Sequence, residues 1–206
     1  MRKRVLAVLA VLCLLIPASL GARSLVNVSL GFGASYRATG DEEFSQGLSN
    51  PDNWCFHGEI IARLAFIQAQ ALVFPMECPE GNQGILLVGM GSLNLPLAGS
   101  LLSLEAGGGI GLTYIPSNSA QTRPSYILAG GESKDVSSMT FGEALYRSPI
   151  YLQVGVATEL GPIALRLRYF MSTQTALEDI FGEKGFWSIF NVDSGALSLV
   201  LSLKMF

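Results

Sequence analysis

Residues 194–206, SGALSLVLSLKMF, alternate between two kinds of side chain and end the chain. The odd positions are large and apolar, and they are Leu197, Leu199, Leu201, Leu203 and Met205. The even positions are mostly small or polar, and they are Ala196, Ser198, Val200, Ser202 and Lys204. A period of two is typical of a β-strand with one apolar face. Because the ends of soluble chains usually fray, so long an apolar strand in this place indicates a sheet whose outer surface does not face water.

The first residues have the layout of a secretory signal peptide. Three basic residues precede an apolar run over residues 5–16, and small residues follow the run. The run is too short to span a membrane. We expect cleavage after Gly21 or Ala22, so that residues 1–22 are the signal peptide and residues 23–206 form one barrel domain.

Charge and composition exclude several classes of partner. The chain has a formal net charge of -3, and removal of the three basic residues of the signal would change it to -6. No basic cluster follows, so we expect no nucleic-acid partner. Charged residues make up 14% of the chain, against about a quarter in typical globular proteins. Because no second apolar run is long enough for a transmembrane helix, the remaining way for such an exported chain to span a membrane is a closed β-barrel.

Alternating stretches predict an all-β fold, an eight-stranded antiparallel transmembrane β-barrel of the up-and-down type. Apolar residues on one face of each strand, and Gly, Ser and a few charges on the other, suit a lipid-facing wall around a narrow lumen. The predicted strands are residues 25–36, two strands within 58–76, then 85–95, 101–115, 149–160, 163–172 and 194–206. A soluble lipocalin-like barrel is the alternative, but it would leave Gly, Ser and a few charges as its whole outer surface.

The predicted connections differ in length at the two ends of the barrel. Those after the first, fifth and seventh strands are long, and those after the second, fourth and sixth are short. This asymmetry is typical of long extracellular loops and short periplasmic turns. Within the second long loop, residues 126–128 and 139–141 are candidates for a hairpin that extends the barrel above the membrane.

Two cysteines bear on the least certain region, residues 58–76. The region fits either two short strands, with a turn near residues 68–70, or one amphipathic helix. Cys55 lies just before it and Cys78 just after it, and two cysteines in an exported protein favour a disulfide. A hairpin brings its two ends within the roughly 7 Å that a disulfide requires, whereas one long helix does not. We therefore predict a hairpin and a Cys55–Cys78 disulfide. The third cysteine, Cys13, lies in the signal peptide and lacks the small residues that precede the cysteine of a lipidation site.

The inward positions of the predicted strands supply candidate residues of a lumen or pathway. They are Glu59, Arg63, Glu105, Tyr151, Gln153, Glu159, Arg166 and Arg168. Three are glutamates and three are arginines, and unpaired charges in a narrow interior are costly, so we expect these charges to pair. One interpretation is a salt-bridged plug that holds the barrel rigid. The other is a narrow polar path or a proton-linked gate, and the sequence leaves both open.

The glycine run GGGIG, residues 107–111, lies inside a predicted strand. Glycine permits strong curvature and close approach of strands, and we consider that it leaves a lateral gap in the wall. A nucleotide-binding loop is not indicated, because no helix follows the run.

No group of residues indicates catalysis or metal binding. The single histidine, His57, lies at the outer end of the second predicted strand. A general base needs a nucleophile and an orienting acid within reach, but no motif ties His57 to the nearby Ser45, Ser49 and Asp52. We therefore predict a solvated loop histidine, no catalytic residue and no enzyme. The acidic loops lack the spacing of a calcium loop, so we predict no metal and no cofactor.

Aromatic residues gather where the predicted strands meet the long loops, as in the interfacial girdle of membrane barrels. They are Tyr36, Trp54, Phe56, Phe74, Tyr114, Tyr169, Phe170 and Trp187. With the signal peptide, the eight strands and the terminal Phe206, the chain resembles small eight-stranded outer-membrane proteins of the OmpW and OmpX kind. Its few lysines and many glycines are also similar to spirochaete members. The resemblance implies a place in the bacterial outer membrane, with Leu201, Leu203 and Phe206 as an assembly signal, although Phe206 lies out of the register that the leucines share.

The resemblance also implies candidate functions and partners. OmpW-like proteins are thought to pass small hydrophobic molecules through the barrel wall, which suggests a narrow conduit or binding barrel for such solutes. OmpX-like proteins present loops, which suggests an adhesin or interaction protein that binds a host ligand. A lipid-modifying enzyme centred on His57 is a third hypothesis. We favour the first, with the outer-membrane bilayer and the barrel assembly machinery as partners, and a monomer, because a closed barrel has no free sheet edge.

Overall fold

The computed structural model describes residues 26–37, 44–78, 82–98, 101–117, 123–182 and 185–205. The predicted signal peptide and Phe206 lie outside the described residues, as does the side chain of Cys78. The cleavage site and the role of Phe206 in assembly therefore stay predictions.

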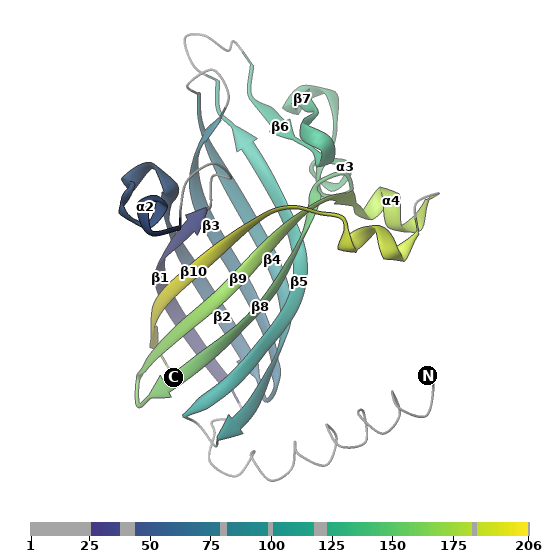
Figure 1. Ribbon diagram of the computed structural model, residues 1–206. Coiled ribbons are helices and arrows are strands. Elements are labelled where there is room, and N and C mark those ends of the chain that lie inside the picture. Colours follow the sequence, from purple (N-terminus) through teal and green to yellow (C-terminus); the bar gives the residue numbers. More distant parts are fainter. Residues whose placement is uncertain are drawn as a thin grey trace.

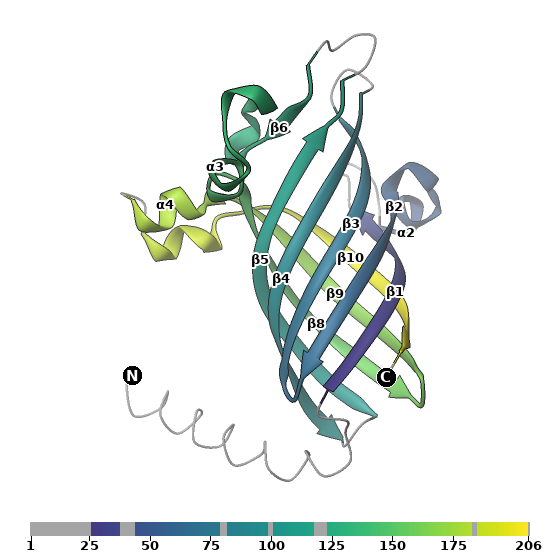
Figure 2. The ribbon, with the colours of Figure 1, turned by 180° about the vertical axis from the view of Figure 1, so that it is seen from behind.

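Eight long strands form one closed antiparallel barrel, so the predicted fold class is confirmed (Figure 1, and from behind in Figure 2). Each barrel strand pairs with its neighbour in the chain, and the pairing of the first strand with the last closes the ring. The barrel strands are β1 (Val26–Arg37), β2 (Trp54–Leu64), β3 (Ile67–Cys78), β4 (Asn82–Ala98), β5 (Leu102–Ile115), β8 (Pro149–Leu160), β9 (Ile163–Ala176) and β10 (Val192–Lys204).

The alternation of the sequence decides which side chains face outward. On β10, Leu201 is 57% exposed, whereas its neighbour Ser202 is 2% exposed and faces the lumen. On β1, Leu30 and Phe32 are exposed, whereas Ser29 is completely buried. An apolar belt around a polar interior is the reverse of a soluble barrel and is the surface that lipid covers. No helix among the described residues is long and apolar enough to span a membrane.

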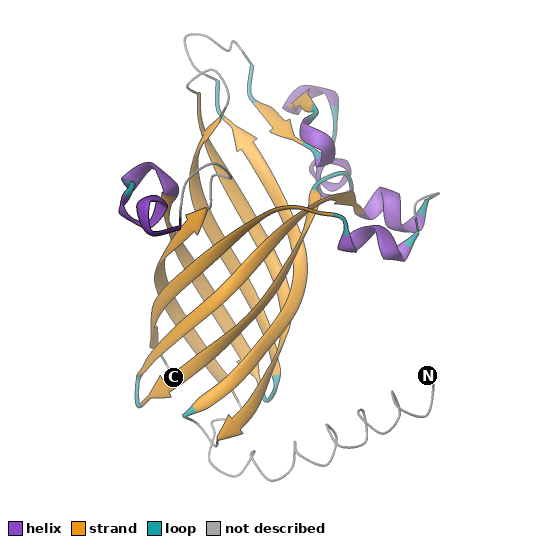
Figure 3. Ribbon diagram, in the orientation of Figure 1, coloured by secondary structure: helices purple, strands orange, loops and turns teal. Residues whose placement is uncertain are grey.

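Short turns lie at one end of the barrel and folded loops at the other (Figure 3). The turns at Ala65–Phe66 and Gly161–Pro162 have two residues each. The loop after β1 contains α2 (Phe44–Ser49) and η2 (Pro51–Asn53). The other two long loops hold β6 (Ser125–Ile127), η4 (Ala129–Gly131), β7 (Ser133–Asp135), η5 (Val136–Ser138), α3 (Phe141–Tyr146), α4 (Leu177–Phe181) and η6 (Phe186–Phe190). We call the two ends the turn side and the loop side.

The hairpin predicted over residues 58–76 is confirmed, and the helix alternative is wrong. Paired residues of β2 and β3 run from Leu64 and Ile67 to Gly58 and Val73. The predicted place of the turn, near residues 68–70, is also wrong. Ala65 takes a φ of 54°, and this left-handed conformation closes a two-residue turn without glycine.

The hairpin predicted from residues 126–128 and 139–141 is wrong in its second strand. β6 pairs with β7 rather than with residues 139–141. The chain turns back earlier because Gly130 and Gly131 both take positive φ angles. Residues 139–141 instead lead into α3, because the side chains of Thr140 and Glu143 form a capping box that starts a helix.

The second long loop packs against the outside of the barrel. Leu112 points outward from β5 but is only 3% exposed, because Tyr126, Leu128 and Ala144 of the loop cover it. Arg147, at the end of α3, forms an ion pair with Glu178 of the third long loop, at 3.1 Å between Nε and Oε2. The two loops therefore form one connected surface on the loop side.

The glycines of β5 allow a sharp bend and leave no gap. A methyl group at Gly107 or Gly109 would overlap the backbone of β4. Both glycines are nevertheless paired on both sides, with β4 and with β8. Their close approach to β4 agrees with the prediction. A lateral gap in the run is wrong, because residues 107–110 pair with both neighbouring strands and Gly111 pairs with β4.

Candidate functional site

The lumen has two parts with different chemistry. The turn-side part holds charged side chains, which we call the ionic plug: Glu59, Arg63, Glu105, Glu159, Arg166, Arg168 and Lys204. The loop-side part is lined mostly by apolar side chains around a pocket. Six members of the plug were predicted to face the lumen, and the seventh, Lys204, lies on the inward positions of β10.

Ion pairs join the plug across the barrel. Arg168 donates to two carboxylates, at 2.5 Å from Nη1 to Oε2 of Glu59 and 2.8 Å from Nε to Oε2 of Glu105. Arg166 Nε lies 3.3 Å from Oε1 of Glu105. Closer to the turns, Glu159 forms ion pairs with Arg63 and with Lys204. The charges therefore pair as expected.

Neutral polar side chains complete the plug. Asn94 Nδ2 donates to Glu105 at 2.9 Å, and Gln70 Nε2 donates to the hydroxyl of Ser92 at 2.8 Å. Gln153 is also buried, but its amide makes no hydrogen bond with the described part of the chain. Every charge of the plug therefore has an opposite partner, and Lys204 is its one member that is not buried.

The prediction of a solvated histidine is wrong. His57 is 1% exposed and points into the lumen at the upper edge of the plug. Its two ring nitrogens face the hydroxyls of Ser35 and Ser198, at 3.3 and 3.4 Å, and its ring stacks on Phe74 at 4.5 Å between centroids. The strand period places His57 inside the barrel, since it lies two residues from Glu59. Its side-chain partners are two hydroxyls, not the Ser45, Ser49 and Asp52 of the predicted loop. No carboxylate of the described residues forms a hydrogen bond with the ring.

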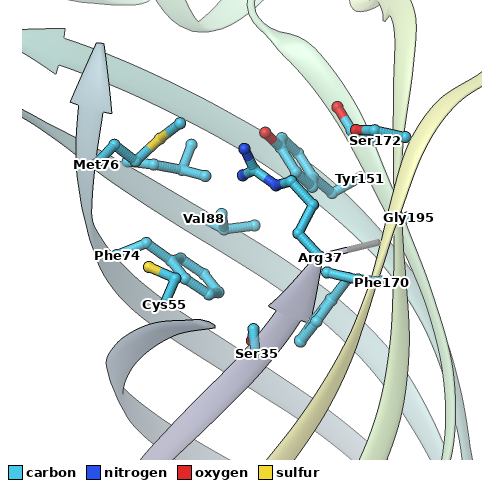
Figure 4. Close-up of a pocket in the computed structure, with 13 residues that line it drawn as sticks. Ser35, Arg37, Cys55, Phe74, Met76, Val88, Tyr151, Phe170, Ser172 and Gly195 are labelled. Atoms are coloured by element: carbon cyan, nitrogen blue, oxygen red, sulfur yellow. The ribbon is translucent and has the colours of Figure 1, made fainter. Parts of the chain in front are cut away.

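Above the plug, apolar side chains surround a pocket with a cavity volume of about 80 Å³, which opens toward the loop side (Figure 4). Side chains of β3, β4 and β9 form its lower wall, where Phe74 and Phe170 meet edge to face at 6.3 Å between centroids. The lining comprises Ser35, Arg37, Cys55, Phe74, Met76, Leu86, Val88, Tyr151, Phe170, Ser172, Ser194, Gly195 and Ala196.

The pocket as a whole was not predicted from the sequence. The strand alternation places Ser35, Tyr151 and Phe170 on inward positions, and all three line it, but of these only Tyr151 was a predicted pathway residue. Phe74 and Phe170 were assigned to the interfacial girdle, and this is wrong, because both point into the lumen. The missed signal is the run Ile85, Leu86, Leu87 and Val88. Since consecutive residues of a strand face opposite sides, an unbroken apolar run makes the lumen face apolar too.

Arg37 lies at the mouth of the pocket. It is the last residue of β1, and its side chain reaches across the pocket toward Tyr151 (Figure 4). Among the residues that the structure describes, it is the one charged member of the lining. Arg37 forms no ion pair with any carboxylate that the structure describes. The guanidinium is thus an available cation beside an apolar cavity.

The wall beside the pocket has one interrupted seam, between β2 and β3. Backbone pairing ends at Gly58 and Val73, although both strands continue toward the loop side. Pro75 lies in the unpaired stretch, and proline cannot donate to a strand ladder. Cys55 Sγ instead lies 3.2 Å from the carbonyl oxygen of Pro75. The thiol of Cys55 is free in this structure, and with the side chain of Cys78 outside the described residues the disulfide stays a prediction.

The other predicted residues lie where their strand positions place them. Leu201 and Leu203 are exposed on the outer face of β10. Of the predicted girdle, Phe56 and Tyr169 are exposed on the outside, and Trp187 is 78% exposed on η6. Tyr36 is outward but buried, because its hydroxyl packs against Gly47 of α2.

Comparisons with known proteins show the fold. The chain is similar to the N-terminal β-barrel domain of Pseudomonas aeruginosa OprF, with a TM-score of 0.51 and 10% identity over 88% of this chain and 98% of that one. It also matches Neisserial surface protein A, with a TM-score of 0.42 and 14% identity over 88% and 98%, and P. aeruginosa OprH, with 0.49 and 15% over 87% and 99%. No family model and no curated protein sequence matches the chain.

Proposed function

We propose that this protein is a non-enzymatic outer-membrane β-barrel that binds small, apolar solutes in the loop-side half of its lumen. One observation carries the proposal: an apolar pocket opens at the end of the barrel that bears the long loops, and the ionic plug closes it below. Ligand sites are typically concave and mostly apolar, with a few polar groups. Of the two forms of the hypothesis, we favour a binding barrel over an axial conduit, and the support is that buried, paired charges cross the lumen below the pocket.

A bound solute leaves the pocket through the mouth or sideways. The sideways path that we propose is the seam between β2 and β3, because there the strands are not joined by backbone hydrogen bonds. We propose this seam in place of the glycine run of β5, because residues 107–110 of that run pair with the strands on both sides. With the Cys55 thiol free, as in this structure, opening the seam costs one thiol contact, from Cys55 to Pro75, rather than a ladder of backbone bonds. The predicted Cys55–Cys78 disulfide would instead join β2 to β3 and hold the seam closed.

Photolabelling of the refolded protein in lipid nanodiscs tests the proposal. The reagent is decanol with a diazirine at its far end, and mass spectrometry locates the labelled residues. We expect labels on lumen residues of the pocket, and their loss in Val88→Trp, which fills the cavity. Leu87→Trp is the matched control, because Leu87 is the neighbouring residue on the lipid face. Labels confined to lipid-facing residues would refute binding in the lumen.

Planar-bilayer recording separates binding from conduction. We expect the folded wild-type protein to be silent, because conduction requires an ion pair of the plug to open. Discrete current steps that change when Arg166 or Glu105 is neutralised would instead establish an axial pathway and overturn the plugged form of the proposal.

A second candidate is a surface interaction protein that binds a host or envelope partner through its loops. The observation that favours it is the connected loop surface, in which a buried cluster holds β6 and α3 and the Arg147–Glu178 ion pair links two loops. Loops without a binding role need no such order. Replacing residues 123–147 by a short linker should abolish partner binding on whole cells while lumen labelling persists, and unchanged cell binding would exclude this candidate.

A further inference from the structure

The charge at the mouth of the pocket specifies the class of solute further, and this step rests on the proposed function. A cavity for purely apolar molecules needs no charge, yet one arginine stands over this one. Arg37 is exposed and has no carboxylate partner in the described part of the chain. A guanidinium is the side chain best suited to bind a carboxylate with two parallel hydrogen bonds.

The surroundings of Arg37 are suited to the polar end of an amphipathic molecule. Tyr151 and Ser172 lie on the same side of the pocket mouth and carry hydroxyls that can donate (Figure 4). Asp193, which precedes the lining residue Ser194, is not part of the lining and accepts a hydrogen bond from Gln174 at 2.8 Å. The carboxylate of Asp193 is nevertheless within electrostatic range of Tyr151. An anion at the mouth would therefore meet the donors and the positive charge of Arg37, with one negative charge nearby.

The lower pocket is suited to an alkyl chain. Val88, Leu86 and Phe170 belong to a buried apolar cluster directly below the mouth. Beneath them His57 stacks on Phe74, and the ionic plug begins at Glu59 and Arg168. An alkyl chain can fill the apolar part, but it cannot continue through the plug, so a chain of medium length fits better than a long one.

We propose that the pocket binds medium-chain alkyl carboxylates, with the carboxylate on Arg37 and the alkyl chain against Val88 and Phe170. Charge and shape are complementary in this orientation alone. The reverse orientation would place an anion against apolar side chains, at the cost of its hydration.

Competition photolabelling tests this assignment. Decanoate carrying a terminal diazirine is bound to the protein in nanodiscs at pH 8, and unlabelled decanoate and decanol compete with it. We expect decanoate to compete at about a tenfold lower concentration than decanol, the effect of one charge-assisted hydrogen-bonded contact. Arg37→Ala should remove this difference, and Arg37→Lys should retain part of it.

Arg123→Ala is the control for a general loss of positive charge, because Arg123 is an exposed loop arginine paired with Asp135 outside the pocket. Equal competition by decanol and decanoate, with Val88→Trp still blocking both, would overturn the carboxylate assignment and leave the proposed function intact. Absence of any lumen label would refute both. Labels in the lumen that Arg37→Ala does not weaken would also overturn the role of Arg37.

Discussion

The ionic plug makes a quantitative prediction about stability that can be tested through Glu105. Its side chain is completely buried and accepts hydrogen bonds from four groups. They are Arg166 Nε at 3.3 Å, Arg168 Nε at 2.8 Å, Asn94 Nδ2 at 2.9 Å and Gln68 Nε2 at 3.4 Å. Glu105→Gln keeps the shape of the side chain and removes its charge, and it also places an amide N–H₂ where a carboxylate oxygen accepts a hydrogen bond. Its cost therefore combines the lost charge with lost hydrogen bonds.

The magnitude follows from the charges that remain. The plug holds four cationic side chains and three carboxylates, a net charge of +1, and Glu105→Gln raises it to +2. Arg168 keeps Glu59 as a partner, but Arg166 loses its one carboxylate among the described residues. Removing one partner of a buried ion pair usually lowers the free energy of unfolding by about 3–5 kcal/mol. We therefore expect Glu105→Gln to lower the free energy of unfolding by about 3 kcal/mol, the lower end, because Arg168 stays paired.

The assay is reversible guanidinium unfolding of the refolded barrel in lipid vesicles, followed by tryptophan fluorescence. Arg166→Met in the Glu105→Gln background removes the orphaned charge and should restore much of the lost stability, which a double-mutant cycle would record as strong coupling. The control is Glu178→Gln, because Glu178 forms an exposed ion pair with Arg147 and such pairs contribute no more than about 1 kcal/mol.

Two results would refute this reasoning. If Glu105→Gln unfolds at the same guanidinium concentration as the wild type, the charges of the lumen are hydrated and screened rather than buried as a plug. If Arg166→Met fails to compensate, the cost of Glu105→Gln comes from lost hydrogen bonds and not from an uncompensated charge.

Three further predictions concern curvature, lipid contact and the loops. Gly109→Ala should prevent refolding, because a methyl group would overlap the carbonyl oxygen of Gly89, and the folded, heat-sensitive band on detergent gels measures this. Trp187 should lie at the lipid surface, because it is 78% exposed beside the exposed aromatic rings of η6, so headgroup-proximal brominated lipids should quench it in a variant with no other tryptophan. Hydrogen bonds from the N–H and hydroxyl of Thr140 hold the pKa of Glu143 below its usual 4.5. The ionised carboxylate therefore stabilises the start of α3 at a pH above 4.5. This contribution is lost as the pH falls through the lowered pKa of Glu143. Pepsin should then cleave the loop faster.

Each of these predictions has a control. Gly91→Ala should refold, since a methyl group there meets open space, and equal refolding of both alanine variants would contradict the argument about curvature. If Trp187 is quenched only by bromines at the bilayer centre, or by none, the prediction that α4 and η6 lie at the membrane surface is refuted. In Glu143→Gln the acid-induced increase in pepsin cleavage should be absent, and an unchanged increase would assign it to other groups.

The alternation of the sequence was sufficient to predict the barrel, because the period of two is a local property of each strand. Residues 194–206 show this clearly: each leucine predicted to face outward is exposed, and Ser198 and Ser202 are buried. The long loops at one end of the barrel and the short turns at the other were also predictable, because the lengths of the stretches between alternating segments can be read from the sequence. The inward charges were identified for the same reason, and charge neutralisation alone indicated that they pair.

Which side chains meet across the lumen was decided by the tertiary structure. Arg168 and Glu59 are 109 residues apart in the chain, and Arg63 and Glu159 are 96 apart. Their heights in the barrel depend on the tilt and stagger of all eight strands, which no single strand specifies. The same stagger places Phe74 and Phe170 together as a pocket wall, and brings Arg37 from the end of one strand over a cavity formed by others. The sequence therefore determined the inner and outer faces of each strand, whereas only the closed sheet decided where the plug ends and the pocket begins.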